Sequence, residues 1–364
     1  MILVTGATGF VGREIARRLL AAGRPVLALA RSRGGATAFE RVIRAVGGVP
    51  PATSLDVVEG DLAAADCGVG ADDWRRLRAI VETVIHCAGD TTFFPETLAP
   101  HTAGHVDGPV RLLHRLAGGR LRRWAHLSTA YVCGLRSGTV LEGQGDVGQE
   151  FHNPYEQVKL ESETAMRAAA LRLGVEVAVL RPSIVVGEAP ATPGGNPSNL
   201  FFSFIRLVAA LAQLPDGAET RLRIEAAPSA PFNIVPVGYV AAAAIALAEH
   251  PEAAGRTFHL VVPDAPTQAD MLAVITTRLG VHGLSLVDPL CDPTPFERAV
   301  ARMLAAYRPY LTQHVRFDDA TTARLLAGGG VPRATLSPDA VHRLIDLALV
   351  TDDARSTLAV PVAW

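Results

Sequence analysis

A tyrosine and a lysine four residues apart, Tyr155 and Lys159, are the residues of this sequence best suited to acid–base chemistry. In a helix this spacing places both side chains on one face, so both can reach the same bound molecule. A phenol with a pKa of about 10 exchanges protons poorly near neutral pH, so a neighbouring ammonium that favours the phenolate would help it. Shifting that pKa by about 3 units requires roughly 4 kcal/mol, which a partly desolvated cation can supply. The pair predicts a proton-transferring centre.

Lys159 is also the only lysine of the chain, so the 34 basic residues are 33 arginines and this one. A coding bias toward arginine can leave one lysine by accident, and a tyrosine four residues before a lysine is common in helices. The position of the pair argues against accident, because the helix expected at 154–173 follows a strand that ends in His-Leu-Ser-Thr at 126–129. A hydroxyl from that strand end would lie beside the tyrosine. A planar guanidinium could not replace a compact ammonium there.

A glycine-rich turn opens the chain. The apolar run 2–5 predicts a buried strand, and apolar residues at helical spacing over 11–22 predict a helix that ends at Gly23. Glycines between such a strand and helix permit a tight turn and let the backbone approach the pyrophosphate of a dinucleotide at the helix N-terminus. The residues expected to contact this cofactor are Thr5, Gly6, Thr8, Gly9, Phe10, Val11 and Gly12.

The end of the second expected strand, 25–30, indicates which dinucleotide binds. NAD sites place an acidic residue there to hold the ribose hydroxyls, and this chain instead has Arg31 and Arg33. Guanidinium groups are bidentate partners for phosphate, and the alternative is that both are solvated surface residues. The two arginines favour NADP over NAD.

Two further strand ends are expected to face the cofactor, because doubly wound sheets bind ligands at the carboxyl ends of their strands. Asp61 and Leu62 follow the strand at 55–59, and Asp61 could accept from the adenine amino group or simply form a turn. Cys87, Ala88 and Gly89 end the strand at 81–87. Their small side chains would let the backbone lie against ribose and nicotinamide.

The order of elements predicts an α/β fold. Short apolar strands alternate with helices at 38–46, 109–117 and 154–173, and strands at 123–128 and 176–181 continue the series. Fully apolar strands joined through helices imply a parallel sheet covered on both faces, here a doubly wound sheet of the Rossmann type.

After Gly187 the amino-acid composition changes. A stretch rich in Pro and Gly is followed by expected helices at 200–214 and 295–311. We therefore expect residues 1–187 to form the NADP-binding domain, with 233–262 returning to it. Residues 188–232 and 263–364 would form a smaller, mostly helical substrate-binding lobe. Its apolar residues could hold an acyl chain or simply be core, and they are Phe201, Phe202, Phe204 and Ile205.

Composition excludes several classes of protein. The formal net charge of -2 and the absence of a basic run argue against nucleic acid as a partner. Four scattered cysteines and an N-terminus without a leader-like segment favour a reducing cytoplasm, and no membrane span is expected. Among the histidines, His101 and His105 have helical spacing but no evident third ligand, so we expect no metal. A P-loop is excluded because that motif needs a lysine directly after a glycine, and the only lysine of this chain follows Val158.

Three segments resemble the extended short-chain dehydrogenases: the glycine turn 6–12, the Tyr155 and Lys159 pair, and the run Leu-Arg-Pro-Ser-Ile-Val-Val-Gly at 180–187. The resemblance covers roughly residues 1–260. The segments 126–132, 153–163 and 181–185 are similar to the thioester reductase and fatty acyl-CoA reductase branch, whereas the C-terminal third matches only loosely.

This resemblance implies a catalytic set of Thr129, Tyr155 and Lys159. Thr129 matches by its distance to Gly134, and Ser128 is the fallback. The family often has an Asn at the position that His105 occupies in this chain. Any role of that Asn in organising the site is therefore in doubt for this protein. The resemblance also implies cofactor contacts from Tyr155 and Lys159 and from the strand-end run Pro182, Ser183 and Ile184.

The leading hypothesis is hydride delivery from NADPH to the carbonyl of an acyl thioester, either coenzyme A or carrier-bound, which yields an aldehyde or alcohol. Thr129 and Tyr155 would hydrogen-bond the developing oxyanion, and Lys159 would bind the nicotinamide ribose and lower the tyrosine pKa. One alternative is an NADP-dependent ketone or alcohol oxidoreductase or an epimerase. A second is a non-catalytic NADP-binding sensor. The sequence indicates neither the acyl group nor the oligomeric state.

Overall fold

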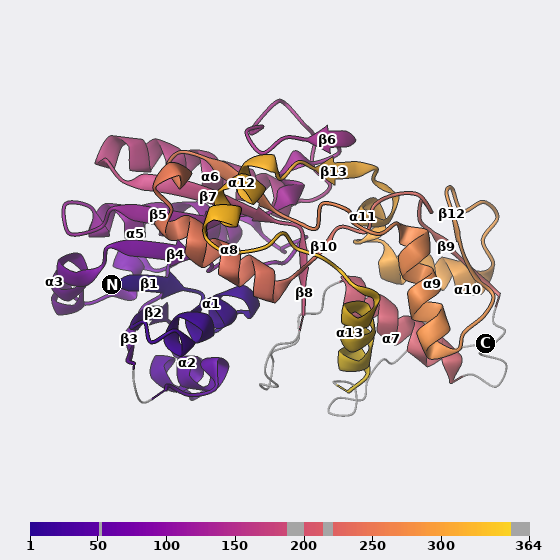
Figure 1. Cartoon of the computed structure of the whole chain (residues 1–364), viewed down its shortest axis with the longest axis horizontal. Coiled ribbons are helices and arrows are strands. Elements are labelled where there is room, and N and C mark those ends of the chain that lie inside the picture. Colours follow the sequence, from indigo (N-terminus) through magenta and orange to yellow (C-terminus); the bar gives the residue numbers. More distant parts are fainter. Residues whose placement is uncertain (51–52, 188–199, 214–220, 351–364) are drawn as a thin grey trace. The chain divides into compact units, whose positions relative to one another are not determined.

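The computed structural model describes residues 1–50, 53–187, 200–213 and 221–350 (Figure 1). The chain divides into two compact units. The first comprises Met1–Gly195, Asn233–Asp264 and Val315–Thr335, and the second comprises Asn196–Phe232, Ala265–His314 and Leu336–Trp364. The chain thus passes between the two units several times, and each unit is considered by itself.

A seven-stranded parallel sheet forms the centre of the first unit. Its spatial order is β3-β2-β1-β4-β5-β7-β11, so the order reverses between β1 and β4, which is where doubly wound sheets bind ligands. The strands pair in parallel throughout, for example Thr5 with His86 across β1 and β4. Their bounds are β1 (Ile2–Thr5), β2 (Val26–Ala30), β3 (Leu55–Glu59), β4 (Thr83–His86), β5 (Arg123–Leu127), β7 (Glu176–Pro182) and β11 (Thr257–Leu260).

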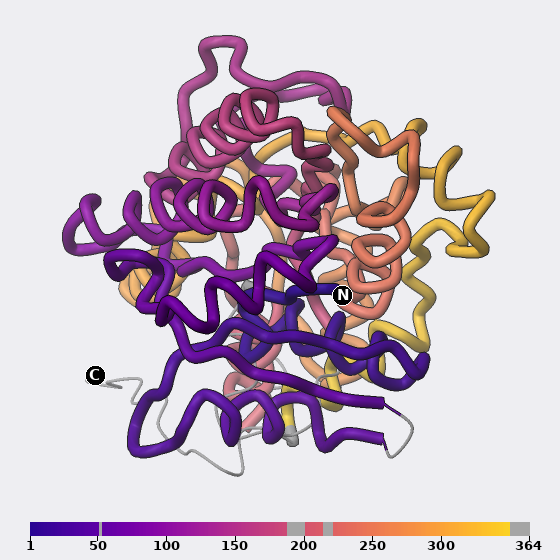
Figure 2. The backbone as a smooth tube through the Cα atoms, turned by 90° about the vertical axis from the view of Figure 1, so that its left-hand side faces the viewer, coloured from indigo at the N-terminus to yellow at the C-terminus, as the bar shows by residue number. Residues whose placement is uncertain are grey.

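Helices cover both faces of this sheet, as Figures 1 and 2 show. The helices α1 (Phe10–Ala21), α2 (Ala38–Val46), α8 (Val237–Glu249) and α12 (Ala320–Gly328) lie on one face. On the other face lie α3 (Ala71–Ile80), α5 (Gly108–Leu116) and α6 (Pro154–Leu173), and α5 and α6 run next to one another in Figure 2. The apolar strands β1, β2 and β4 are fully buried between these layers, whereas most residues of the edge strand β3 are partly exposed.

Local sequence signals set the helix ends. Thr37 and Glu40 form a capping box at the start of α2, in which each side chain binds the other residue's backbone N–H. Asn153 caps α6 by accepting from the N–H of Glu156, Pro154 occupies the first turn, and Gly174 ends the helix in the left-handed region. The doubly wound Rossmann sheet predicted from the sequence is confirmed, with most element ends within one or two residues.

The second unit is smaller and mostly helical. The helices α7 (Leu200–Ala212), α9 (Gln268–Leu279) and α13 (Pro338–Val350) pack against one another, and β9 (Leu222–Glu225) pairs in parallel with β12 (Leu284–Val287). The prediction of a single helix at 295–311 is wrong. It is two helices, α10 (Pro295–Leu304) and α11 (Arg308–Thr312), because Pro309 begins a new helix and cannot continue an old one.

The predicted boundary between the lobes differs from the structure at 315–335, which the sequence assigned to the substrate lobe. There β13 (Val315–Phe317) pairs with β6 (Gly138–Val140), and α12 packs on α8 and β11, so this segment belongs to the first unit. A further short pair joins β8 (Ile184–Val186) to β10 (Ile234–Pro236). Long-range strand pairing of this kind leaves no local pattern in the sequence.

Residues proposed to line an acyl pocket are core residues of the second unit. Phe201, Phe202 and Ile205 are fully buried, and Phe204 is 7% exposed. Their apolar surface packs inside the unit and offers little area to a ligand.

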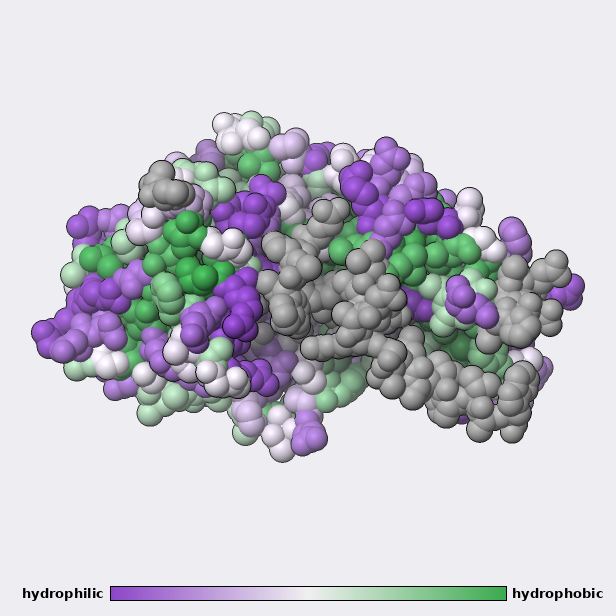
Figure 3. Space-filling view, turned by 90° about the horizontal axis from the view of Figure 1, so that it is seen from below, coloured by the Kyte–Doolittle hydropathy of each residue, from purple (hydrophilic) through white to green (hydrophobic). Residues whose placement is uncertain are grey.

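The described helices include none long and apolar enough to cross a membrane. The face displayed in Figure 3 carries hydrophilic patches interspersed with apolar ones.

Candidate functional site

Three glycines shape the turn between β1 and α1. Gly6 has a φ of +71° and lies so close to the exit of β4 that a Cβ would be 2.7 Å from the Ala88 nitrogen. At Gly12 a Cβ would lie 2.2 Å from the Gly6 carbonyl oxygen, and the N–H of Gly9 donates to that same oxygen at 2.8 Å. Side chains at these positions would force the helix away from the strand. The glycines therefore fix how α1 approaches the sheet.

The N-terminus of α1 is suited to an anion. Its cap residue, Gly9, contributes no side-chain hydrogen bond, and the first turn holds no acidic residue. The N–H groups of such a turn and the positive end of the helix dipole favour a phosphate. Thr8, Phe10 and Val11 are partly exposed around this turn. These features fit the pyrophosphate of a dinucleotide.

Thr5 has a structural role within this site. Its hydroxyl lies 2.8 Å from His86 Nδ1 and accepts hydrogen bonds from the N–H groups of Cys87 and Ala88, each at 3.2 Å. Thr5 is 1% exposed. It therefore joins the ends of β1 and β4 rather than offering its side chain to a ligand. The backbone of Cys87 and Ala88 is held in place beside the glycine turn by this hydroxyl.

A group of arginines follows β2. Arg31 pairs with Asp61 at 3.1 Å, and both side chains are substantially exposed. Arg41, from α2, donates to the Arg31 carbonyl oxygen, and burial together with the charges of Arg31 and Arg33 lowers the pKa of Arg41. Three guanidinium groups thus lie near one another after β2. Sequence reasoning missed Arg41, although its position in the helix after β2 was the available signal.

Asp61 and Leu62 have protein partners of their own. Asp61 accepts from the N–H of Ala63 at 3.0 Å in addition to its pair with Arg31, which is typical of a residue that forms a turn. The Leu62 carbonyl oxygen accepts from Arg111 at 3.1 Å. Both residues stand at the carboxyl edge of the sheet, beside the arginine group, and the turn-former alternative accounts for the contacts of Asp61.

Lys159 lies at the carboxyl ends of β4 and β5. Its ammonium donates to the Leu127 carbonyl oxygen at 2.6 Å, and the side chain comes from α6, on the face that packs toward the sheet. Burial lowers the pKa of Lys159 to about 8, although Glu163 and the Cys87 thiol oppose this shift. The lysine is therefore a desolvated cation bound to Leu127, the last residue of β5 and two residues before Thr129.

Tyr155 stands one helical turn before Lys159. Burial raises its pKa well above the usual value for a phenol, and the charges of Glu156 and Asp90 act in the same direction. This is opposite to the expected effect of Lys159, whose charge does not outweigh burial here. The phenol is consequently protonated at neutral pH, the form that can donate a proton to a developing oxyanion.

Thr129 follows β5 and begins a short 3-10 turn, Ala130–Cys133, that packs against α6. Its hydroxyl donates to the Pro182 carbonyl oxygen at 3.5 Å and accepts from the Tyr131 N–H at 3.3 Å. The fallback residue Ser128 is 4% exposed, and its hydroxyl has no partner among the described residues. Both hydroxyls lie at the same strand end as Lys159.

The run after β7 is fixed by a buried ion pair. Arg181 donates two hydrogen bonds to Glu163 of α6, at 2.9 and 2.6 Å, and both side chains are at most 3% exposed. Pro182 and Ser183 are buried, Ile184 is partly exposed, and the Ser183 hydroxyl has no partner among the described residues. A bidentate pair of this kind holds the strand end at a defined place against α6.

His101 and His105, which have the helical spacing of a metal-binding pair but lack a third ligand in the sequence, lie beside Tyr155. The rings of His101 and His105 are 4.6 Å apart, and both meet the Tyr155 ring edge-on, at centroid distances of 6.4 and 5.9 Å. The part of the chain that the structure describes contains no cluster of three or more metal-ligating side chains. Aromatic spacing in the sequence could not reveal this contact, because it joins the segment after β4 to α6.

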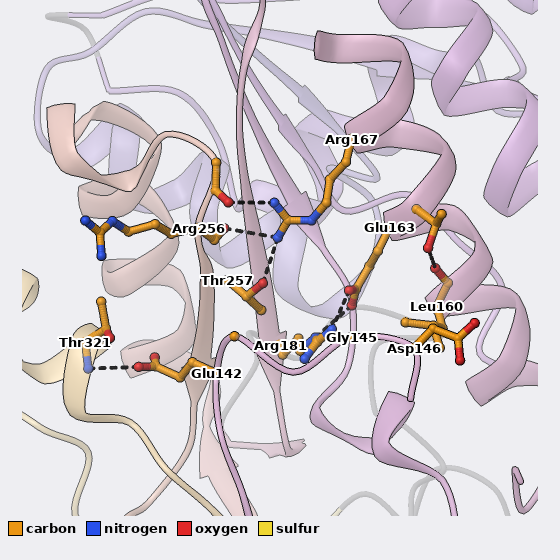
Figure 4. A pocket seen from close by; sticks show the side chains of 13 residues that line it. Glu142, Gly145, Asp146, Leu160, Glu163, Arg167, Arg181, Arg256, Thr257 and Thr321 are labelled. Carbon is orange, nitrogen blue, oxygen red and sulfur yellow. Dashed lines mark hydrogen bonds and ion pairs between the residues drawn. The ribbon is translucent and has the colours of Figure 1, made fainter. Parts of the chain in front are cut away.

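A cavity of about 480 Å³ opens beside α6 (Figure 4). From this helix it is lined by Glu163, Thr164 and Arg167, and Glu163 lies one turn after Lys159. Arg167 donates to the Gly255 carbonyl oxygen and to the Thr257 hydroxyl. Arg181 and Glu163 bind one another within this lining, which does not include Thr129, Tyr155 or Lys159.

Comparison with known proteins identifies relatives for most of the chain. A family model described as Male sterility protein, an NAD-binding family, matches residues 4–244. The NRPS-like oxidoreductase fscA of Fusarium equiseti is 28% identical over 233 residues, which is 61% of this chain and 21% of that protein. The chain spans between 5 and 24% of the length of the curated relatives that it matches first.

Solved structures share the fold. The terminal R domain of the myxalamid PKS-NRPS biosynthetic pathway superposes with a TM-score of 0.76 at 21% identity, over 98% of this chain and 92% of that one. A UDP-glucuronic acid 4-epimerase of Bacillus cereus, in complex with UDP-glucuronic acid and NAD, superposes with a TM-score of 0.68 at 17% identity, over 96% of this chain and 99% of that one. Reductase and epimerase domains therefore share this architecture.

Proposed function

The chain belongs to the NAD(P)-binding Male sterility protein family of extended short-chain dehydrogenases, and we propose that it reduces an acyl thioester with NADPH. The observation that carries this proposal is the position of Tyr155 and Lys159. Both side chains come from α6: Lys159 reaches the Leu127 carbonyl oxygen at the end of β5, and Tyr155 meets the rings of His101 and His105 in the segment after β4. A dinucleotide on that turn would extend its nicotinamide toward them.

The reaction follows from these positions. NADPH, when bound, supplies a hydride to the acyl carbon. Protonated Tyr155 donates its proton to the carbonyl oxygen, with the Thr129 hydroxyl as a second donor, so the carbonyl becomes a hemithioacetal. Cleavage of its carbon–sulfur bond releases a thiol and an aldehyde. Reduction of the aldehyde by a second hydride and proton would give the alcohol.

Lys159 serves the bound cofactor and the tyrosine. Its ammonium is desolvated and uses one of its three donors on Leu127, so two remain for ribose hydroxyls. Its charge favours the phenolate, whereas burial of Tyr155 raises the pKa of the phenol and acts in the opposite direction. This balance keeps the phenol in its donating form, which suits reduction rather than oxidation.

NADPH is proposed over NADH on the arginine group. Arg31 is partly neutralised by Asp61, so Arg33 and Arg41 carry most of the charge that a 2′-phosphate would meet. Arg33→Ala combined with Arg41→Ala should weaken NADPH binding by roughly 100-fold and leave NADH binding nearly unchanged, as expected for two lost charge-assisted hydrogen bonds. Equal weakening of both cofactors would contradict this assignment.

The acyl group is proposed to arrive on a carrier, coenzyme A or a carrier protein. The name of one structural neighbour supports a carrier, since the myxalamid structure is the terminal R domain of a PKS-NRPS biosynthetic pathway. We further propose the reducing cytoplasm as its compartment, because all four cysteines are unpaired.

Product analysis tests the proposal. The protein is incubated with NADPH and panels of acyl-CoA thioesters, aldehydes and ketones, and NADPH oxidation is followed together with free thiol and carbonyl products. Thioester-dependent release of one thiol per aldehyde is the expected result, and Tyr155→Phe and Lys159→Arg should abolish it while the matched control Tyr307→Phe retains it. Turnover of ketones without any thioester would favour the alcohol dehydrogenase or epimerase alternative. NADPH binding with no turnover, unchanged in Tyr155→Phe, would favour the sensor.

A further inference from the structure

His105 stands in a π-helical turn, Ala103–Asp107, between α4 (Leu98–Thr102) and α5. Such turns insert one residue into a helix and often occur where a side chain must be aimed at a site. Here the turn brings the His105 ring to 3% exposure and to 4.6 Å from the ring of His101. The bulge thus displays an imidazole toward the sheet end that carries the catalytic candidates.

The His105 side chain binds the backbone that follows β4. Its Nε2 lies 2.7 Å from the Asp90 carbonyl oxygen and 3.1 Å from the Asp90 nitrogen. Its ring also lies directly on Gly89, where a Cβ would be 2.6 Å from the ring carbon Cε1. The imidazole therefore leaves no room for a side chain at residue 89. From the sequence we expected a small residue there for a different reason, the close approach of the backbone to ribose. The ring anchors the segment proposed to face the cofactor.

The same ring meets Tyr155 edge-on, with centroids 5.9 Å apart and planes at 76°. The backbone of His105 is tied to α6 as well, because the Ser162 hydroxyl donates to the His105 carbonyl oxygen, and Ser162 lies one turn after Lys159. Burial and the charge of Lys159 lower the pKa of His105 to about 3, so the ring is neutral and does not repel the ammonium. One residue therefore contacts both the strand exit and the tyrosine.

We propose that His105 is a positioning residue that holds the Gly89–Asp90 backbone in place for the cofactor and the Tyr155 ring in place for proton donation. The inference rests on the proposed reductase function and goes beyond it, because it assigns two separable contacts to one imidazole. The hydrogen bond to Asp90 governs cofactor affinity. The ring contact with Tyr155 governs the chemical step.

Two variants separate these contacts. His105→Phe keeps the ring and loses the hydrogen bond, so NADPH affinity should fall about tenfold while kcat stays within about threefold, in line with one lost hydrogen bond. His105→Gln places an amide near the position of Nε2 and loses the ring, so affinity should stay within about threefold while kcat falls about tenfold, in line with one lost aromatic contact. His114→Gln, at an exposed position of α5, is the matched control and should change neither.

NADPH affinity is measured by fluorescence titration and kcat by product formation. A crossed pattern supports the proposal, whereas equal changes in both parameters in both variants, or none in either, overturn it. The titration needs no turnover, so inactivity of the wild type toward every thioester would refute the reductase while the anchoring of Asp90 would still be decided.

A double-mutant cycle between Gly89 and His105 provides a second test. Gly89→Ala should reduce kcat/KM at least tenfold in the wild type, because its methyl group would displace the imidazole. In the His105→Ala background the same change should cost less than about threefold, since the obstructing ring is gone. Equal costs in the two backgrounds would show that Gly89 does not depend on His105 and would overturn the proposal.

Discussion

Replacing the buried ammonium of Lys159 should make the cofactor-free protein more stable while it abolishes turnover. The lysine is 5% exposed, and its pKa is lowered from 10.5 to about 8 by burial. A difference of about 2.5 units at roughly 1.36 kcal/mol each corresponds to about 3 kcal/mol of destabilisation at neutral pH. Lys159→Met removes this cost and keeps the length of the side chain.

The sign of the pH dependence follows from the same values. Between about pH 8 and 10.5 the unfolded chain binds a proton at Lys159 that the folded protein has released, so the stability of the wild type rises with pH. The advantage of Lys159→Met is therefore complete below about pH 8 and disappears as the pH approaches 10.5.

Thermal unfolding without NADPH measures this difference. About 3 kcal/mol should raise the Tm of Lys159→Met by about 6–12 °C at neutral pH for a unit of this size. Gln157→Met, on the exposed side of the same helix, is the control for helix propensity and should change little. A Lys159→Met protein that is no more stable than wild type, or whose advantage is unchanged at high pH, would refute the reasoning that burial of the charge is costly.

Two further predictions concern residues that support the site. Glu163→Gln should lower the free energy of unfolding by about 3–5 kcal/mol in urea titrations, because it leaves the buried guanidinium of Arg181 without its charged partner. Glu161→Gln, at an exposed position of the same helix, is the control. A loss of stability equal to that of the control would contradict the role of the ion pair. Gly12→Ala should weaken NADPH binding at least tenfold, since its methyl group would lie 2.2 Å from a backbone oxygen of the glycine turn. The helical Gly328→Ala, which has open space around it, should bind NADPH normally, and tight binding by Gly12→Ala would refute the packing argument.

Local sequence patterns determined most of the first unit. Apolar runs and the glycine turn specify strands and helices through contacts between near neighbours, so the doubly wound sheet and the positions of Tyr155 and Lys159 on one helix face could be predicted. The missing acidic residue after β2 pointed to the arginine group in the same way, because that site is built from residues close in sequence.

Long-range packing decided what the sequence could not show. The return of 315–335 to the first unit depends on a strand pair between Val315–Phe317 and Gly138–Val140, which are far apart along the chain. The raised pKa of Tyr155 differs from the lowering expected of Lys159, because the spacing shows the nearest charge but not the desolvation of the phenol.

The sequence by itself therefore determined the fold class and the pair of Tyr155 and Lys159, since helical periodicity and turn chemistry act over a few residues. Only the tertiary structure decided the surroundings of that pair: the desolvated ammonium on Leu127, the protonated phenol, and the imidazole of His105. Burial and contacts between distant segments set these properties, and they arise only when the strand ends and α6 come together.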